Sequence, residues 1–216
     1  MSVINSDGKH GLHPIAKWSL IVAPILWIVG GLMMTGGAFG EYGAKWVQTI
    51  AAEGDTAKLG IMLSVAAGLL FVRSVAGISQ IAPEAAVNRM RLATIGGAIA
   101  VASWTPLLGI GLAVADGADI IAVAAPIMIG MQNASNLVFM MALIPLGGGL
   151  ALAGLFPQAR IIGLVVLIIA IVGIVTTFVL GANDETGALI FALIQFILAI
   201  IFLAIGVMMF SSGSDD

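Results

Sequence analysis

The sequence predicts an all-α integral membrane protein with six transmembrane helices, and two observations carry this prediction. Of its 216 residues, 61% are apolar and only 9% are charged, whereas a soluble domain carries about 25% charged residues. Several stretches are also apolar over the roughly 20 residues that a helix needs to cross the hydrocarbon core. The six stretches are Ile15–Met34, Leu59–Ala82, Leu92–Val114, Gln132–Phe156, Ile161–Leu180 and Leu189–Phe210. Unpaired backbone groups are costly in lipid, so these stretches are expected to be helices.

The predicted organisation is a single membrane bundle over residues 15–210, between a polar N-terminus, 1–14, and an acidic tail, 211–216. With six spans, both termini lie on one side of the membrane. That side then holds most of the basic residues, namely Lys9, Lys17, Arg89, Arg91 and Arg160, and the other side holds Lys45 and Lys58. Because lysine and arginine are enriched in cytoplasmic loops, both termini are predicted to be cytoplasmic.

The segment 120–156 does not fit one ordinary span, because its 37 residues are too many for one helix and few for two. Pro126 and the polar residues 132–136 interrupt it. We expect an interfacial or re-entrant segment, Ile120–Met131, followed by the fourth span. The alternative is a seventh span with a turn at residues 132–136, which places Arg160 outside and conflicts with the charge rule.

The loop after the first span predicts a short amphipathic helix over residues 41–52. Tyr42, Trp46 and Ile50 recur every four residues, which places them on one helical face. This helix is expected on the outer side of the membrane. It is either an anchor at the interface, where Trp and Tyr are favoured, or a lid over a cavity.

Arg73 is the one charge well inside a predicted span, and burying arginine at the bilayer centre costs roughly 2.5–3.5 kcal/mol. No Asp or Glu lies inside any span. Gln80 shares its helical face, and Trp104 and Thr105 of the third span are expected at a similar depth. The partners open to Arg73 are groups of the bundle, lipid phosphates, an acidic residue of another subunit, or an anionic ligand.

A second face of the same span carries the small residues Gly60, Ser64 and Gly68 at four-residue spacing. Small residues at this spacing let another helix approach closely. Since one face offers polar contacts and another offers tight packing, this span is predicted to be central in the bundle.

Amide side chains form a second candidate site. Gln132, Asn133 and Asn136 fall near one face at the outer end of the fourth span, and Gln195 lies in the outer half of the sixth. These residues are expected to line a shallow polar cavity that opens outward. The alternative is that the amides tie neighbouring helices together, each contributing about 0.6–2 kcal/mol.

Two prolines and a glycine run are candidate hinges. Pro106 and Pro145 each remove a helical hydrogen bond, and Pro145 is followed by Gly147, Gly148 and Gly149. The run is either a helix break that lines a pathway, as in transporters with discontinuous helices, or a kink filled by a neighbouring helix.

Several chemistries are missing. The chain has no cysteine, and its two histidines, His10 and His13, precede the first span, so neither a buried haem pair nor a membrane metal centre is predicted. No lysine or carboxylate lies mid-span for a Schiff base or an ion relay. We therefore predict no enzyme activity, no metal and no other cofactor. No basic cluster suggests nucleic acid, so the expected partners are the lipid bilayer and either other membrane subunits or further copies of the chain.

Two functions remain. The first is a non-catalytic membrane subunit or scaffold that packs against other membrane chains, tied to them through Arg73. The alternative is a transporter or channel for a small neutral or anionic solute. There Arg73 would attract the solute, the outer amides would receive it, and the kinks at Pro106 and Pro145 would assist gating.

Overall fold

The computed structural model describes residues 3–4, 10–37, 43–156, 158–181 and 183–211. Its helices are α1 (Pro14–Met34), α2 (Gly43–Glu53), α3 (Asp55–Ile81), α4 (Glu84–Ala115), α5 (Ile121–Ala153), α6 (Ala159–Val179) and α7 (Glu185–Ser211). Before α1, the two-residue strand β1 (Val3–Ile4) pairs antiparallel with β2 (His10–Gly11). Six of the helices are long and apolar enough to cross a membrane, and α2 is the exception. The all-α, six-span prediction is therefore confirmed.

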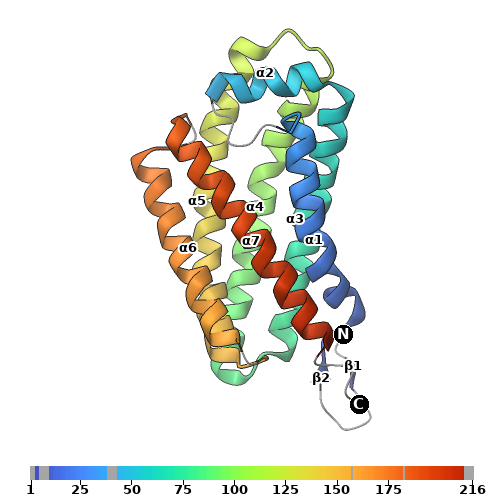
Figure 1. The fold of residues 1–216 in the computed structure, drawn as a ribbon, viewed down its shortest axis with the longest axis vertical. Coiled ribbons are helices and arrows are strands. Elements are labelled where there is room, and N and C mark those ends of the chain that lie inside the picture. Colours follow the sequence, from blue (N-terminus) through green and yellow to red (C-terminus); the bar gives the residue numbers. More distant parts are fainter. Residues whose placement is uncertain (1–2, 5–9, 38–42, 157, 182, 212–216) are drawn as a thin grey trace.

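The six long helices form a ring in which each packs against its neighbours in the chain and α7 returns to pack against α1. Figure 1 shows α1 beginning and α7 ending at the same end of the bundle, which we call the terminal end, while α2 runs crosswise over the other, the α2 end. Which end faces the cytoplasm stays a prediction from the basic residues. Residues 212–216 of the predicted acidic tail lie outside the described residues.

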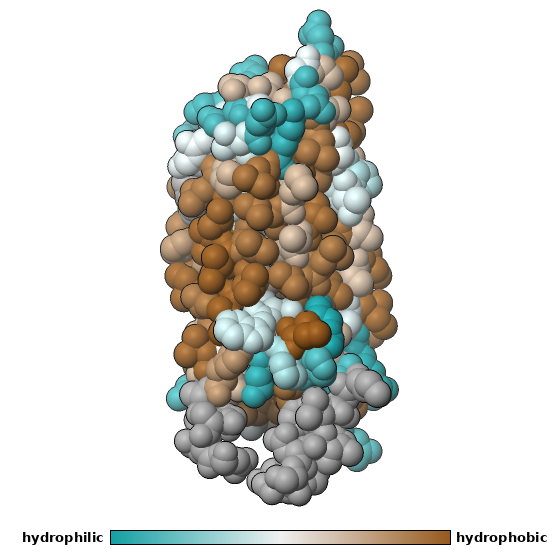
Figure 2. Space-filling model, turned by 90° about the vertical axis from the view of Figure 1, so that its right-hand side faces the viewer, coloured by the Kyte–Doolittle hydropathy of each residue, from teal (hydrophilic) through white to brown (hydrophobic). Residues whose placement is uncertain are grey.

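The outer surface of the ring is apolar, as a helical membrane protein requires. On the face shown in Figure 2, a broad hydrophobic band crosses the middle of the molecule, with polar side chains gathered towards both ends. Exposed isoleucine, leucine and valine side chains on every long helix supply this band. The chain is thus an integral, multi-pass membrane protein whose solvent over most of its surface is lipid.

The predicted close-packing strip of α3 does hold two other helices. A Cβ added to Gly30 of α1 would lie 2.6 Å from the Ser64 hydroxyl oxygen and 2.7 Å from the Gly60 carbonyl oxygen. Gly68 faces α4, where an added Cβ would lie 3.0 Å from Val101. The strip therefore sets the spacing of α1, α3 and α4. The prediction that this span is central in the bundle is wrong, because α5 is more deeply buried. Within the most apolar 18 residues of each helix, 61% are buried in α5 and 44% in α3.

α5 also corrects the expected division of the segment 120–156. Residues 121–153 form one continuous helix, so Ile120–Met131 is not a separate interfacial segment and no seventh span turns at residues 132–136. Its 33 residues reach roughly 50 Å at 1.5 Å per residue, well beyond a hydrocarbon core of about 30 Å. The extra turns stay helical because Ala124, Ala125 and Met128 pack in a second apolar cluster with Val47 and Ile50 of α2.

The glycine run of α5 lies within the same continuous helix and is no break. A Cβ on Gly147 would lie 2.6 Å from the Gly163 carbonyl oxygen of α6. Gly148 and Gly149 face α4 on the other side, where added Cβ atoms would meet Arg89 and Met90. The three glycines therefore allow α4 and α6 to approach α5 from two sides, which is why α5 is so deeply buried.

Candidate functional site

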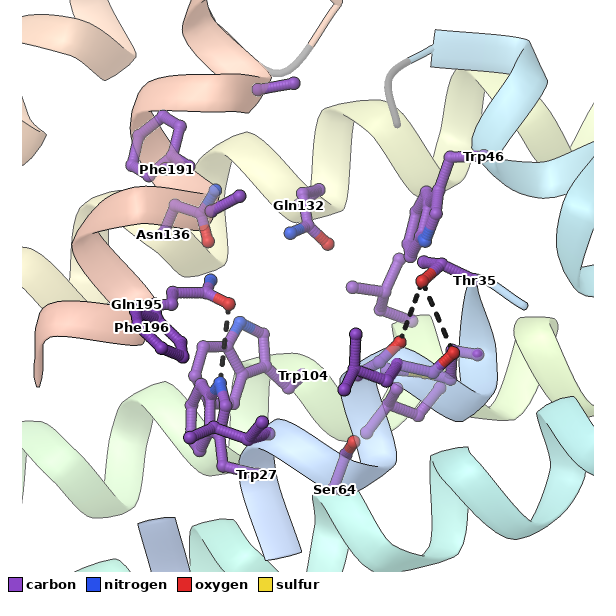
Figure 3. Close-up of a pocket in the computed structure, with 18 of the residues that line it drawn as sticks. Trp27, Thr35, Trp46, Ser64, Trp104, Gln132, Asn136, Phe191, Gln195 and Phe196 are labelled. Atoms are coloured by element: carbon purple, nitrogen blue, oxygen red, sulfur yellow. Dashed lines mark hydrogen bonds between the residues drawn. The ribbon is translucent and has the colours of Figure 1, made fainter. Parts of the chain in front are cut away.

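A cavity of about 230 Å³ lies inside the ring near the α2 end. It is bordered by every helix except α6, and its wall combines aromatic, aliphatic and uncharged polar side chains. None of the described residues in the wall is charged. The polar and aromatic members are Trp27, Thr35, Trp46, Ser64, Trp104, Gln132, Asn136, Phe191, Gln195 and Phe196. Figure 3 shows the three amides on one side of the space and Trp46 with Thr35 on the other.

The floor of the cavity is an aromatic cluster. The rings of Trp27 and Trp104 meet edge to face with centroids 4.8 Å apart. Both lie against Phe139 of α5, at centroid distances of 5.8 and 5.4 Å. Phe139 is in turn edge to face with Phe71 of α3, at 5.8 Å. Four helices thus meet in one rigid layer of rings below the cavity, since such pairs add to the free energy gained from burial alone.

Gln195 of α7 joins this floor to the amide side. Its Oε1 accepts a hydrogen bond from the Trp27 indole Nε1 at 3.4 Å. A second, small cavity of about 30 Å³ lies beyond this pair and shares Trp27 and Gln195 with the first. The Trp27–Gln195 hydrogen bond therefore spans the boundary between the two spaces and links α1 to α7 (Figure 3).

Asn136 is the unusual residue of the wall. Its side chain is 1% exposed, and neither its Nδ2 nor its Oδ1 has a hydrogen-bond partner among the described residues. A buried amide without a partner costs about 1–3 kcal/mol per unmet group. Gln132 lies one turn away on the same face of α5 and also borders the cavity. Asn136 borders the cavity, so its amide is the unused hydrogen-bonding group nearest to this space among the described residues.

The hydroxyl groups of the wall are occupied within their own helices. Ser64 Oγ donates to the Gly60 carbonyl oxygen at 2.9 Å, and Thr35 Oγ1 donates to the Gly31 carbonyl oxygen at 3.1 Å. The Ser64 hydroxyl oxygen can then only accept a further hydrogen bond. The polar capacity of the site thus rests mainly on its amides.

α2 forms part of the wall at its own end of the bundle. Trp46 and Gly43 border the cavity, while Val47 and Ile50 are buried against α4 and α5. The apolar face of α2 is thus turned onto the bundle, as a cover requires. Tyr42, which the sequence placed on the same face, lies outside the described residues.

The cavity brings together Trp104, Gln132, Asn136 and Gln195 of the predicted site residues. Thr105 and Pro106 are exposed on the outside of α4, where the Thr105 hydroxyl donates to the Val101 carbonyl oxygen. Asn133 is half-buried towards the turn after α6, where it lies beside Gly181. Pro145, half-buried within α5, is also absent from the wall.

Arg73 lies away from the cavity. Nine residues separate it from Ser64, which borders the cavity, and at about 100° per residue this puts the two on opposite sides of α3. Its own face carries Met62 and Leu69, which are 63% and 59% exposed, and the exposed Gln80. Arg73 itself is half-buried, because Gly77, one turn further along this face, is buried against Ala16 of α1. Arg73 therefore lies on a face of α3 that is partly exposed to lipid and partly covered by α1.

The expected contact between Arg73 and the third span is also not formed. Gly68 packs on Val101 and Gly97 lies beside Val72, so Arg73 is level with the start of the apolar part of α4. Trp104 is about two helical turns away along that helix. Among the described residues, Arg73 has no hydrogen bond or ion pair.

Comparison with known proteins does not indicate a function for this chain. No protein-family model matches the chain, and neither the curated proteins nor the solved structures give a significant match. Function has to be inferred from the geometry and chemistry of a site and not from the fold that carries it.

Sequence reasoning missed Trp27 and both phenylalanines of the wall, whereas Trp46 was assigned to the helix expected to be an anchor or a lid. The signal that could have found Trp27 and Trp104 is their depth. Tryptophan is enriched at the membrane interfaces, whereas these two lie well inside their helices, and three of the four tryptophans in the chain line one cavity.

Proposed function

We propose that this protein is a membrane carrier that binds a small uncharged molecule with a hydrogen-bonding group in the cavity below α2. The observation that carries the proposal is Asn136, whose buried amide has no partner among the described residues. An amide kept unpaired at a cavity wall is costly for folding, and a bound molecule that donates and accepts hydrogen bonds would offset that cost.

The wall favours an uncharged molecule. No described lining residue carries a charge, and moving an ion into such a site without a counter-charge costs several kcal/mol. Arg73, the residue that would have favoured an anion, lies on the opposite side of α3 from the cavity-lining Ser64. The anionic solute of the sequence-based alternative therefore has no support from this site.

Binding can be measured with the tryptophans of the site. In Trp18→Phe protein the three remaining tryptophans all border the cavity. We expect octanamide to change their emission and raise the thermal midpoint, and octanoate, which has the same chain and a charged head, to do neither. A ligand at 100 times its Kd stabilises the folded state by about 2.7 kcal/mol.

Asn136→Leu should abolish the response to octanamide, because the amide that fixes the head group is gone. The matched control is Asn88→Leu, the same substitution at an exposed position near the start of α4, which should respond as the parent does. Equal binding of octanamide by Asn136→Leu, or equal binding of octanoate and octanamide by the parent, would contradict the proposal.

A second candidate, the membrane subunit, is favoured by Arg73 alone. Arg73 is half-buried beside the exposed Leu69 of α3, and its charge has no partner among the described residues. The carboxylates within the described spans, Asp55, Glu84 and Glu185, stand in the first turn of their helices and not in the apolar part, so a second copy of the chain offers no described carboxylate at the depth of Arg73. We propose that a carboxylate of a different membrane chain pairs with Arg73.

This proposal is tested by the mass of the complex purified in mild detergent. Arg73→Gln should release the partner chain, whereas Arg73→Lys, which keeps the charge, should retain it. Arg91→Gln is the control, since Arg91 is exposed near the start of α4. A parent protein that purifies only as a monomer or homo-oligomer would count decisively against the subunit function.

A further inference from the structure

We infer that the ligand of the cavity is a membrane-dissolved amphiphile that reaches the site from the bilayer, through a lateral opening between α1 and α7. This inference rests on the proposed binding function and adds the route and the class of molecule. An uncharged head such as a hydroxyl, amide or ring carbonyl binds the amides, and an apolar tail extends through the opening.

The opening follows from the way α1 and α7 diverge. Towards the terminal end the two helices are in close contact, since a Cβ on Gly206 would lie 2.9 Å from the Ile21 side chain and 3.1 Å from the Leu20 Cβ. α7 then runs obliquely across the bundle (Figure 1). Beyond the hydrogen bond between Trp27 and Gln195, both helices border the cavity from opposite sides.

Exposure identifies which side of the cavity is open. Among the described residues of the wall, only two are exposed, Leu32 at 39% and Phe196 at 42%. Leu32 belongs to α1 and Phe196 to α7, so both lie on the helices that diverge. The other wall residues are buried or half-buried. Among the described residues, the rim of the opening is therefore made of one leucine and one phenylalanine.

The opening leads to lipid and not to water. On α1, Ile25 and Val29 near the rim are 47% and 40% exposed, and on α7, Leu193 and Ile197 are 47% and 44% exposed. A surface of this kind belongs to the hydrocarbon region, where charged and polar side chains are disfavoured. A molecule already dissolved in the bilayer reaches the rim without crossing a polar layer.

The chemistry of the wall changes from the rim inwards. The rim is aliphatic and aromatic, the indoles of Trp27 and Trp104 form the floor, and the unpartnered amide of Asn136 lies in the buried part of the wall. Small-molecule sites combine mostly apolar walls with a few polar groups that fix orientation. This order matches an amphiphile whose head reaches Asn136 while its tail remains between Leu32 and Phe196.

The test compares two uncharged quenchers that both carry bromine and hydroxyl groups. 11-Bromoundecan-1-ol partitions into phosphatidylcholine vesicles, whereas 3-bromopropane-1,2-diol stays in water. In vesicles holding Trp18→Phe protein, we expect saturable quenching by the first and little by the second, and loss of the saturable part in Asn136→Leu. Stronger quenching by the water-soluble compound would overturn the lateral route.

The position of the opening is tested by Phe196→Ala, which widens the rim and should speed the onset of quenching in a stopped-flow experiment. Phe178→Ala is the matched control, because Phe178 is a lipid-exposed phenylalanine of α6, 74% exposed, that does not border the cavity. An equal effect of the two substitutions would show that the rim is not where we place it.

The two proposals fail separately. If octanamide stabilises the parent but not Asn136→Leu, while 11-bromoundecan-1-ol quenches no better than the water-soluble compound, the lateral route is wrong and the binding site stands. If octanamide has no effect on the parent either, both are wrong.

Discussion

Two adjacent glycines of α1 give a test of the packing that holds the cavity in shape. A Cβ on Gly30 would lie 2.6 Å from the Ser64 hydroxyl oxygen, 2.7 Å from the Gly60 carbonyl oxygen and 3.0 Å from the Ser64 backbone nitrogen. A Cβ on Gly31 would meet nothing within 4 Å. Two of the three atoms near Gly30 are backbone atoms, which cannot rotate away. Gly30→Ala must therefore push α1 away from α3, whereas Gly31→Ala need move nothing.

The size of the difference follows from these contacts. Adding a methyl group to a tightly packed site typically costs about 1–3 kcal/mol, and replacing a mid-helix glycine with alanine returns roughly 0.5–1 kcal/mol in either variant. The gain from replacing glycine with alanine in a helix is the same in both variants and cancels. Gly30→Ala should therefore be less stable than Gly31→Ala by about 1–3 kcal/mol. For a chain of this size, 1 kcal/mol corresponds to a change of about 2–4 °C in Tm.

The assay is the thermal midpoint of each variant in the same detergent, without ligand. We expect Gly31→Ala to equal or exceed the parent and Gly30→Ala to fall several degrees below it. Trp27 lies one turn before the crossing, so the emission of the cavity tryptophans should also change in Gly30→Ala. Equal midpoints for the two variants would refute the close approach of α1 to α3.

Three further predictions address other parts of the bundle. Gly147→Ala should lower the thermal midpoint, because the added Cβ would lie 2.6 Å from a carbonyl oxygen of α6, and Gly109→Ala, with nothing within 4 Å, should not; equal midpoints would contradict this. Gln195→Leu removes the acceptor of the Trp27 indole. It should lower the free energy of unfolding by about 0.5–1.5 kcal/mol and shift Trp27 emission to shorter wavelength; unchanged emission would show that the two side chains are not hydrogen-bonded. A single cysteine replacing Arg160 should be labelled only from the cytoplasmic side, and labelling from outside would reverse the predicted orientation.

The membrane spans could be predicted because a single local quantity determines them. A helix in lipid must be apolar over its whole length, so the prediction Ile15–Met34 differs from α1 by one residue. The same rule failed for α5, which is about 50 Å long. Hydropathy contains no information that α2 would cover the extra turns, because that contact joins residues far apart in the sequence.

The amides of the site could be predicted because a polar side chain stands out in an apolar span. Spacing also places Gln132 and Asn136 on one face of a helix. It does not say which way that face points, and Asn133, one residue away from Gln132, is directed elsewhere. The indoles were missed because a tryptophan in an apolar span looks like ordinary core, and only the tertiary structure brings Trp27 and Trp104 together.

The predicted neighbours of Arg73 on the third span were wrong because the start of that helix was misplaced. Hydropathy places the start of the third span at Leu92, after Arg89 and Arg91, but α4 begins at Glu84. Charged residues in the first turns of a long helix hide its true start. Matching the apparent ends of two antiparallel spans therefore shifted the expected neighbours of Arg73 along α4 and placed Trp104 too close to it.

The geometry of α3 makes the two proposed functions separable by experiment. Arg73 and Ser64 lie on opposite sides of this helix, nine residues apart along it, which is about 13 Å at 1.5 Å per residue. Substitutions separated by more than about 7–10 Å without shared partners act nearly additively. Arg73→Gln should therefore leave octanamide binding unchanged, and Asn136→Leu should leave any complex intact. A variant of either residue that impaired both properties would mean that the partner chain also shapes the cavity, and the subunit and the carrier would then be one function.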